Sequence, residues 1–146
     1  CWPGPKAVIR TAWSWKRCSP GWDGRHEECA VKLLVVLTTE ANQAKAEALA
    51  AQLLEQRLAA CIALQPQQSL YHWQGRIEQD SEVQLVIKTN AERLEALEIA
   101  LHQLHSYDVP EWIVLSGQCS EAYGSWLSSS LKPPQPGPGD AAAPGL

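Results

Sequence analysis

The sequence contains no phenylalanine and no methionine, and no apolar run in it approaches the roughly 18 residues that a membrane-crossing helix needs. We therefore expect no membrane partner. RNA-recognition domains stack bases on aromatic side chains within a basic surface, and the sequence has no matching aromatic string. This absence argues against an RNA-binding module.

Positive charge is also scarce in the central part of the chain. Residues 30–131 contain six Lys or Arg against twelve Asp or Glu. An acidic surface repels phosphate backbones, so we expect no nucleic-acid partner. The same acidity is compatible with attracting cations, although it is also typical of an ordinary soluble surface.

Known catalytic motifs are missing as well. The sequence has no GxSxG, no Gly-rich phosphate loop, no HExxH and no Cys–His pair with an orienting acid, so we predict that the protein is not an enzyme. Five cysteines are present without a CxxC pair. An odd number without this motif favours free thiols in a reducing compartment over a disulfide framework.

The remaining composition predicts one domain with two tails. Residues 1–29 lack a persistent hydrophobic period and are interpreted as a disordered or artefactual N-terminal extension. Residues 30–131 form the domain. Residues 132–146 are rich in Pro, Gly and Ala and are predicted to be a disordered tail, because they cannot bury apolar surface.

Within the domain, apolar periodicity predicts strands and helices in a regular order. An apolar run over 31–39 predicts a strand, and helical spacing follows over 46–58. Further strands are predicted over 61–64, resuming at 69–73 after Pro66, then over 76–88 and 112–115. A second helix is expected over 90–104 with a capping box from Thr89, and a short helix over 120–129.

This β-α-β-β-α-β order predicts an α+β fold of the ferredoxin-like type, with an antiparallel sheet and an extra C-terminal helix. Both central helices would cover one face of the four-stranded sheet. The other face would stay bare and apolar, so we expect the subunit to oligomerise.

Four strings of residues support a closer assignment. They are Arg57–Cys61 (RLAAC), Ser69–Ile77 (SLYHWQGRI), Glu82 followed by Ile87–Thr89, and His105–Glu111 (HSYDVPE). In this order and at this spacing the chain resembles the CutA divalent-cation-tolerance family over nearly all of residues 31–131.

The resemblance implies a homotrimer whose strands extend between subunits. It also implies a cytoplasmic role linked to copper and other divalent cations, without a required cofactor and with Cu(II) or another divalent cation as the candidate ion. An alternative is a PII-like regulator that binds a small anionic metabolite in clefts between subunits. That ligand would need basic residues, for which Lys88, Arg76 and Arg57 are the candidates.

His105 and Glu111 are the predicted metal ligands, because imidazole and carboxylate suit Cu(II) or Zn(II). The alternative is that His105 caps a helix end and Glu111 hydrogen-bonds at an interface. Two positions depart from the family pattern. Ser106 replaces the usual proline, and Thr38 stands where some relatives carry a cysteine proposed as a copper ligand. A hydroxyl is a poor ligand for Cu(I), which prefers sulfur.

A second set of residues is predicted to line an intersubunit cleft or the trimer interface. These residues are Tyr71, Trp73, Glu82, Lys88, Tyr107 and Trp126. The aromatic members could equally fill an apolar interface while their polar tips find partners. Glu82 and Lys88 could simply form an ion pair on the sheet.

Overall fold

The computed structural model describes residues 30–132 of the chain. The elements are β1 (Ala30–Glu40), α1 (Gln43–Glu55), β2 (Cys61–Trp73), β3 (Arg76–Thr89), α2 (Ala91–Leu104), β4 (Ile113–Ser120) and α3 (Glu121–Leu131). The predicted N-terminal extension and the tail after residue 132 lie outside the described residues, so both remain predictions.

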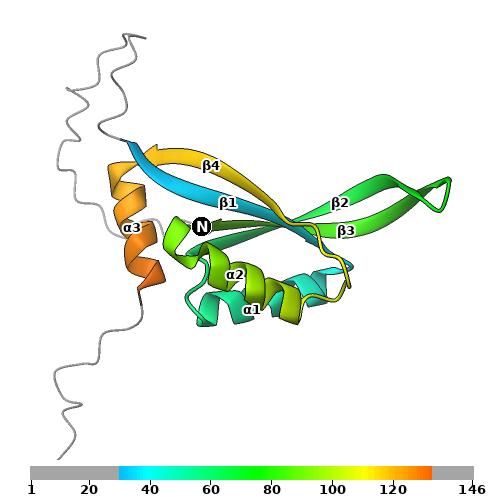
Figure 1. The fold of residues 1–146 in the computed structure, drawn as a ribbon, viewed down its shortest axis with the longest axis horizontal. Coiled ribbons are helices and arrows are strands. Elements are labelled where there is room, and N and C mark those ends of the chain that lie inside the picture. Colours follow the sequence, from blue (N-terminus) through cyan, green and yellow to red (C-terminus); the bar gives the residue numbers. More distant parts are fainter. Residues whose placement is uncertain (1–29, 133–146) are drawn as a thin grey trace, which may run out of the picture.

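The four strands form one sheet in the order β2-β3-β1-β4, and each neighbouring pair is antiparallel (Figure 1). Strands β1 and β2 are therefore parallel to each other across β3 and are joined through α1. Strands β3 and β4 are related in the same way across β1 and are joined through α2. This topology confirms the predicted ferredoxin-like fold.

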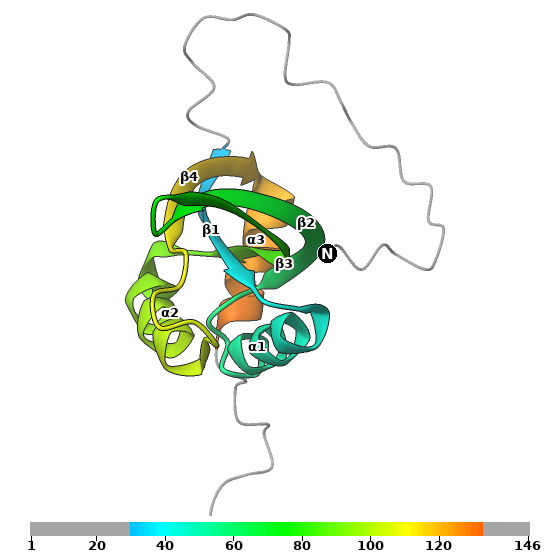
Figure 2. The same cartoon turned by 90° about the vertical axis from the view of Figure 1, so that its right-hand side faces the viewer.

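The main core lies between one face of the sheet and the two helices α1 and α2, which lie side by side (Figure 2). Alternate strand residues such as Val36 and Leu85 point toward the helices and are fully buried. They meet Leu53 of α1 and Leu101 of α2, which are equally buried. Burying each such side chain stabilises the fold by about 1.5–3 kcal/mol.

Each helix begins at a polar residue that satisfies its free backbone groups. The side chains of Asn42, Asn90 and Ser120 each accept a hydrogen bond from the backbone N–H three residues later. The capping box predicted from Thr89 for α2 is wrong. Thr89 instead ends β3, and its hydroxyl donates to the carbonyl of Leu58, so Asn90 is the cap.

The β2–β3 hairpin is longer than the sequence predicted and projects beyond the rest of the sheet (Figure 1). The expected break at Pro66 is wrong, because β2 runs through it. Since β2 is an edge strand, a proline can sit there without interrupting a ladder on both sides. The expected turn is confirmed at Gln74 and Gly75, whose φ angles of 49° and 78° suit a two-residue hairpin loop.

Helix α3 packs against the sheet separately from α1 and α2. Leu127 and Leu131 form a second apolar cluster with Leu33 and Val35. These two β1 residues point to the sheet face opposite the main core, because they alternate with the core residue Val36. The helix therefore covers part of the second sheet face, near the beginning of β1 (Figure 1).

Two arginines hold the C-terminal end of α3. Arg57 Nη1 donates to the carbonyl of Ser130 at 3.1 Å, and Arg93 Nη2 donates to the carbonyl of Leu131 at 2.9 Å. The last carbonyls of a helix lack intrahelical partners and carry partial negative charge. The guanidinium groups supply both the missing donors and a complementary charge.

Gly124 is needed for the contact between α3 and β1. A Cβ at this position would lie 2.5 Å from Val31 Cβ, closer than van der Waals contact allows. We predict that Gly124→Ala lowers the free energy of unfolding by about 1–3 kcal/mol, the usual cost of overpacking, despite the better helix propensity of alanine. Urea denaturation measures this loss. Ser125→Ala, on the exposed side of the same helix, is the control and should cost nothing.

Candidate functional site

The connection from α2 to β4 carries both predicted metal ligands, and a buried carboxylate at the end of β1 anchors it. Glu40 is 1% exposed. Its side chain accepts hydrogen bonds from the Ser106 hydroxyl at 2.5 Å, the Ser106 N–H at 3.1 Å and the Ala41 N–H at 3.2 Å. Glu40 thus fixes the place at which the chain leaves α2.

Burial by itself raises the pKa of Glu40. The hydrogen bonds from the Ser106 side chain and backbone, the nearby His105 and the Ala41 N–H outweigh this, so the pKa is lowered from its ordinary value. Our reading of the sequence missed Glu40. The available signal was an acidic residue at the end of an otherwise apolar strand, directly before a helix cap.

The His105 side chain is fully buried beside Glu40. Its Nδ1 accepts the Tyr107 backbone N–H at 3.0 Å, which assigns the ring proton to Nε2, 3.3 Å from Thr38 Oγ1. Burial lowers the pKa of His105, and the Glu40 carboxylate offsets only part of that effect. The imidazole is therefore neutral at pH 7, and its Nδ1 does not form an ion pair with Glu40 Oε1 3.7 Å away.

Both ring nitrogens of His105 are thus engaged within the subunit. Thr38, which the family resemblance places where some relatives are expected to carry cysteine, therefore lies beside this histidine. His105 could bind a metal through Nδ1 only if the hydrogen bond from the Tyr107 N–H were broken. It could bind through Nε2 only if that nitrogen lost its proton.

Tyr107 connects this loop to the β2–β3 hairpin. Its hydroxyl donates to Glu82 Oε1 at 2.9 Å, and its ring lies 5.3 Å from the His105 ring. Burial, then the hydrogen bond to Glu82, raises the pKa of Tyr107, which stays a protonated donor. Glu82 alternates with the buried Val83, so it lies on the sheet face opposite α1 and α2.

Glu111 is the second acidic group in this region. Its Oε2 atom is buried and has no hydrogen-bond partner within the described part of the chain. Burial raises the pKa of Glu111, and repulsion from the Glu82 carboxylate raises it further. The two carboxylates therefore lie close enough to repel each other. Within residues 30–132, no group of three or more His, Cys, Asp or Glu side chains has the arrangement of a metal site.

The other predicted cleft residues fall in separate places within the subunit. Tyr71 and Trp73 lie near the end of the hairpin, where the Tyr71 hydroxyl donates to Asp80. Trp126 lies in α3, and its ring packs at a tilt against that of Tyr123, with the ring centroids 5.2 Å apart. A cleft that contained them all would need more than one subunit.

Lys88 is not paired with Glu82, because the two residues lie six positions apart on β3, or about 20 Å. In the sheet register Lys88 lies opposite Cys61, and its Nζ is 3.6 Å from Cys61 Sγ. Cys61 is disulfide-bonded, which corrects our expectation of free thiols at this position. Among the described residues, Cys119 is free.

The basic residues predicted for an anionic metabolite are also dispersed. Arg57 binds the end of α3, and Lys88 lies beside Cys61. Arg76 lies at the end of the hairpin, where its Nη2 is 3.4 Å from Glu78 Oε1. The PII-like alternative therefore gains no support from their arrangement.

Comparison with known families matches residues 34–130 to the CutA1 divalent ion tolerance protein model. The divalent-cation tolerance protein CutA of Pectobacterium atrosepticum is 48% identical over 102 residues, covering 68% of this chain and 92% of the relative. The CutA of Yersinia pestis is 45% identical over 100 residues, which cover 67% of this chain and 84% of the relative.

Solved structures give the same result. CutA from Synechococcus elongatus matches with a TM-score of 0.69 and 41% identity, covering 71% of this chain and 94% of that one. CutA1 from Oryza sativa matches with a TM-score of 0.66 and 36% identity, covering 69% and 94%.

One comparison corrects the expected compartment. The CutA of Archaeoglobus fulgidus, described as a periplasmic divalent cation tolerance protein, matches with a TM-score of 0.66 and 26% identity over 68% of this chain and 99% of that one. Our prediction of a cytoplasmic location is therefore wrong, because the fold and family do not imply that compartment. Within residues 30–132, no helix combines the length and the apolar character that a membrane span requires.

Proposed function

The chain belongs to the CutA1 divalent ion tolerance family, and from this premise we propose that it acts in divalent-cation tolerance as a homotrimer that binds divalent cations weakly. The observation that carries the cation proposal is the buried, unpartnered Glu111 Oε2 close to the Glu82 carboxylate. A divalent cation would neutralise both carboxylates and remove their repulsion.

The donor set favours a hard cation over copper. Carboxylate oxygens suit Mg²⁺, Ca²⁺ and Mn²⁺, whereas Cu(II) prefers imidazole nitrogen and Cu(I) prefers sulfur. The imidazole of His105 is occupied by Tyr107 and Thr38, and Thr38 offers no sulfur. We therefore place the cation at Glu111 and Glu82, with His105 joining only if its hydrogen bonds open. Two carboxylates alone give low affinity.

We propose binding rather than catalysis as the role of this region. Glu40, His105 and Tyr107 are used in hydrogen bonds that shape the loop. Glu40 binds Ser106, His105 accepts from Tyr107, and Tyr107 donates to Glu82. A bound cation would supply charge neutralisation, and these residues would hold Glu111 and Glu82 in position.

The homotrimer is supported by apolar side chains that one subunit leaves exposed. On β4, an edge strand, these are Ile113, Val114 and Leu115, and on the projecting hairpin they are Leu70, Tyr71, Trp73 and Ile77. Edge strands carry unpaired N–H and C=O groups and readily accept a further strand. We propose that the hairpin of one subunit covers β4 of the next.

The cation proposal predicts opposite effects of Glu111→Gln without and with metal. Because the folded-state pKa of Glu111 is raised, its ionisation destabilises the fold as pH rises from about 4.5 through that raised pKa. Without metal, the glutamine variant should therefore melt a few degrees higher at pH 7 and show no gain at pH 4. Adding millimolar Mn²⁺ should raise the melting temperature of the natural chain but not that of the variant.

Glu95→Gln is the matched control, since Glu95 is an exposed carboxylate on α2. It should keep the full Mn²⁺ effect. A Mn²⁺ effect that survives in Glu111→Gln would remove Glu111 from the site. A parallel titration with Cu(II) separates the two ligand sets, because binding lost in His105→Ala but kept in Glu111→Gln would assign the ion to the imidazole.

A further inference from the structure

Tyr107 and Glu111 lie on the same short connection between α2 and β4, and the backbone of this connection is fixed within the subunit. The Tyr107 N–H donates to His105 Nδ1 at 3.0 Å, and the two rings lie 5.3 Å apart. Pro110, directly before Glu111, is buried and restricts its own backbone and that of the residue before it. Both side chains therefore start from a backbone whose course does not depend on a bound ion.

The Tyr107 hydroxyl occupies one of the two oxygens of Glu82. It donates to Glu82 Oε1 at 2.9 Å. A carboxylate can bind a cation through one oxygen or through both. A cation that used both oxygens would compete with the hydroxyl for Oε1. As long as this hydrogen bond is kept, Glu82 offers a cation one oxygen.

Glu111 provides the second oxygen of the acidic pair. Its Oε2 is buried and has no hydrogen-bond partner within the described part of the chain. One oxygen from each of two carboxylates suits Mg²⁺ or Mn²⁺, since Mg²⁺ usually keeps several waters and is bound by one or two carboxylates. Ca²⁺ takes roughly 6–8 oxygens and often binds a carboxylate through both of its oxygens.

We propose that Tyr107 makes the acidic pair selective for Mg²⁺ or Mn²⁺ over Ca²⁺, by keeping Glu82 from binding through both oxygens. The selectivity rests on the cation site proposed above and narrows it to one class of ion. Tyr107 acts through Glu82, so it determines specificity without being a ligand. Neither Tyr107, Glu82 nor Glu111 belongs to β4 or to the apolar hairpin residues of the proposed trimer contact.

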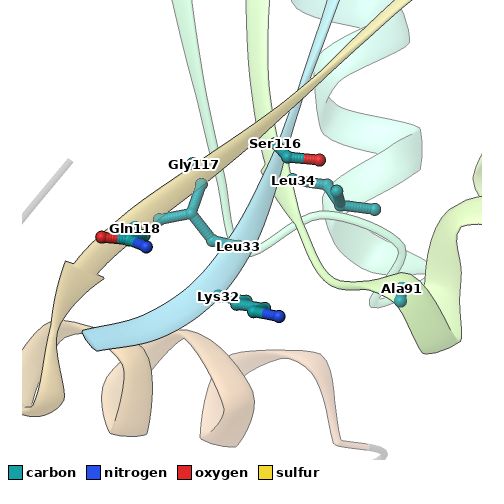
Figure 3. A pocket seen from close by; sticks show the side chains of 7 residues that line it. All are labelled: Lys32, Leu33, Leu34, Ala91, Ser116, Gly117 and Gln118. Atoms are coloured by element: carbon teal, nitrogen blue, oxygen red, sulfur yellow. The ribbon is translucent and has the colours of Figure 1, made fainter. Parts of the chain in front are cut away.

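A groove near the beginning of β1 offers no second cation site. It lies between β1, β4 and the first residue of α2 (Figure 3), whereas Glu40 and the acidic pair lie toward the end of β1. Its described lining residues include Lys32 and no carboxylate. The ammonium group repels divalent cations, so this groove does not compete with the acidic pair for an added ion.

The test is competition against Mn²⁺ on the full chain, with free Mn²⁺ measured by its electron paramagnetic resonance signal. In the natural chain, Mg²⁺ should displace bound Mn²⁺ at a concentration about tenfold lower than Ca²⁺ does. In Tyr107→Phe, Glu82 gains its second oxygen, so Ca²⁺ should bind about tenfold more tightly than in the natural chain. Mg²⁺ binding should stay within about twofold. Structural damage alone would weaken every ion, so a gain for Ca²⁺ identifies the role of the hydroxyl.

Tyr123→Phe is the matched control, because it removes a tyrosine hydroxyl from α3, away from the acidic pair. It should leave the order of the ions unchanged. If Mg²⁺ and Ca²⁺ compete equally in the natural chain, or if Tyr107→Phe leaves their ratio unchanged, the role of Tyr107 is wrong while the cation site stands. If the natural chain binds no Mn²⁺, or if its binding is unchanged in Glu111→Gln, the cation site fails and the selectivity fails with it.

Discussion

Leu115→Lys is expected to convert the proposed trimer into single subunits at micromolar concentration. Leu115 is 49% exposed in the isolated subunit and lies opposite Val35, on the sheet face that α1 and α2 leave bare. In the proposed trimer it is covered by a neighbouring hairpin. Each of the three copies would then bury an unpaired ammonium group, and each such burial costs several kcal/mol.

Sedimentation velocity measures the result directly. Ile99→Lys is the matched control, because Ile99 is an equally large apolar residue, 54% exposed, on the outer side of α2. It should remain trimeric. If the natural chain sediments as a single subunit, the trimer proposal fails. If Leu115→Lys stays trimeric while remaining folded, the interface lies elsewhere.

Ser106→Ala is expected to destabilise the subunit by about 1.5–3 kcal/mol at pH 7, the usual worth of a hydrogen bond to a charged group. The variant leaves the Glu40 carboxylate buried with one strong donor fewer. Because the folded-state pKa of Glu40 is lowered, its stabilisation is complete above about pH 4.5 and is lost as pH falls through the lowered pKa. The gap between variant and natural chain should therefore narrow toward pH 3.

Urea denaturation at several pH values tests this expectation, and a double-mutant cycle assigns the cause. Once Glu40→Gln has removed the charge, Ser106→Ala should cost clearly less than it does in the natural chain. A cost for Ser106→Ala that is constant from pH 7 to pH 3 would contradict the role given to the Glu40 carboxylate.

The order of elements could be predicted from the sequence because each helix and strand has its own hydrophobic period. The turn at Gln74–Gly75 was equally readable from local chemistry. The course of β2 through Pro66 was not, since it depends on β2 being an edge strand, and strand order is a property of the whole sheet.

The candidate site was predicted only in part, for a related reason. The resemblance placed His105, Glu111 and Thr38 in one region, and the contact between Thr38 and His105 agrees with it. The role of Glu40 was missed because its carboxylate is held by donors of Ser106, which lies 66 residues away in sequence. Lys88 and Glu82 are far apart because both lie on β3, where six extended residues separate them by about 20 Å. Whether His105 and Glu111 share an ion remains a prediction.

The two arginines at the end of α3 determine how this terminal helix behaves when the subunit opens. Arg57 belongs to the connection between α1 and β2, and Arg93 to the first turn of α2, yet both hold neighbouring carbonyls. Helix α3 cannot leave the sheet without releasing both. We therefore expect it to unfold together with the two central helices, instead of fraying as a chain end commonly does.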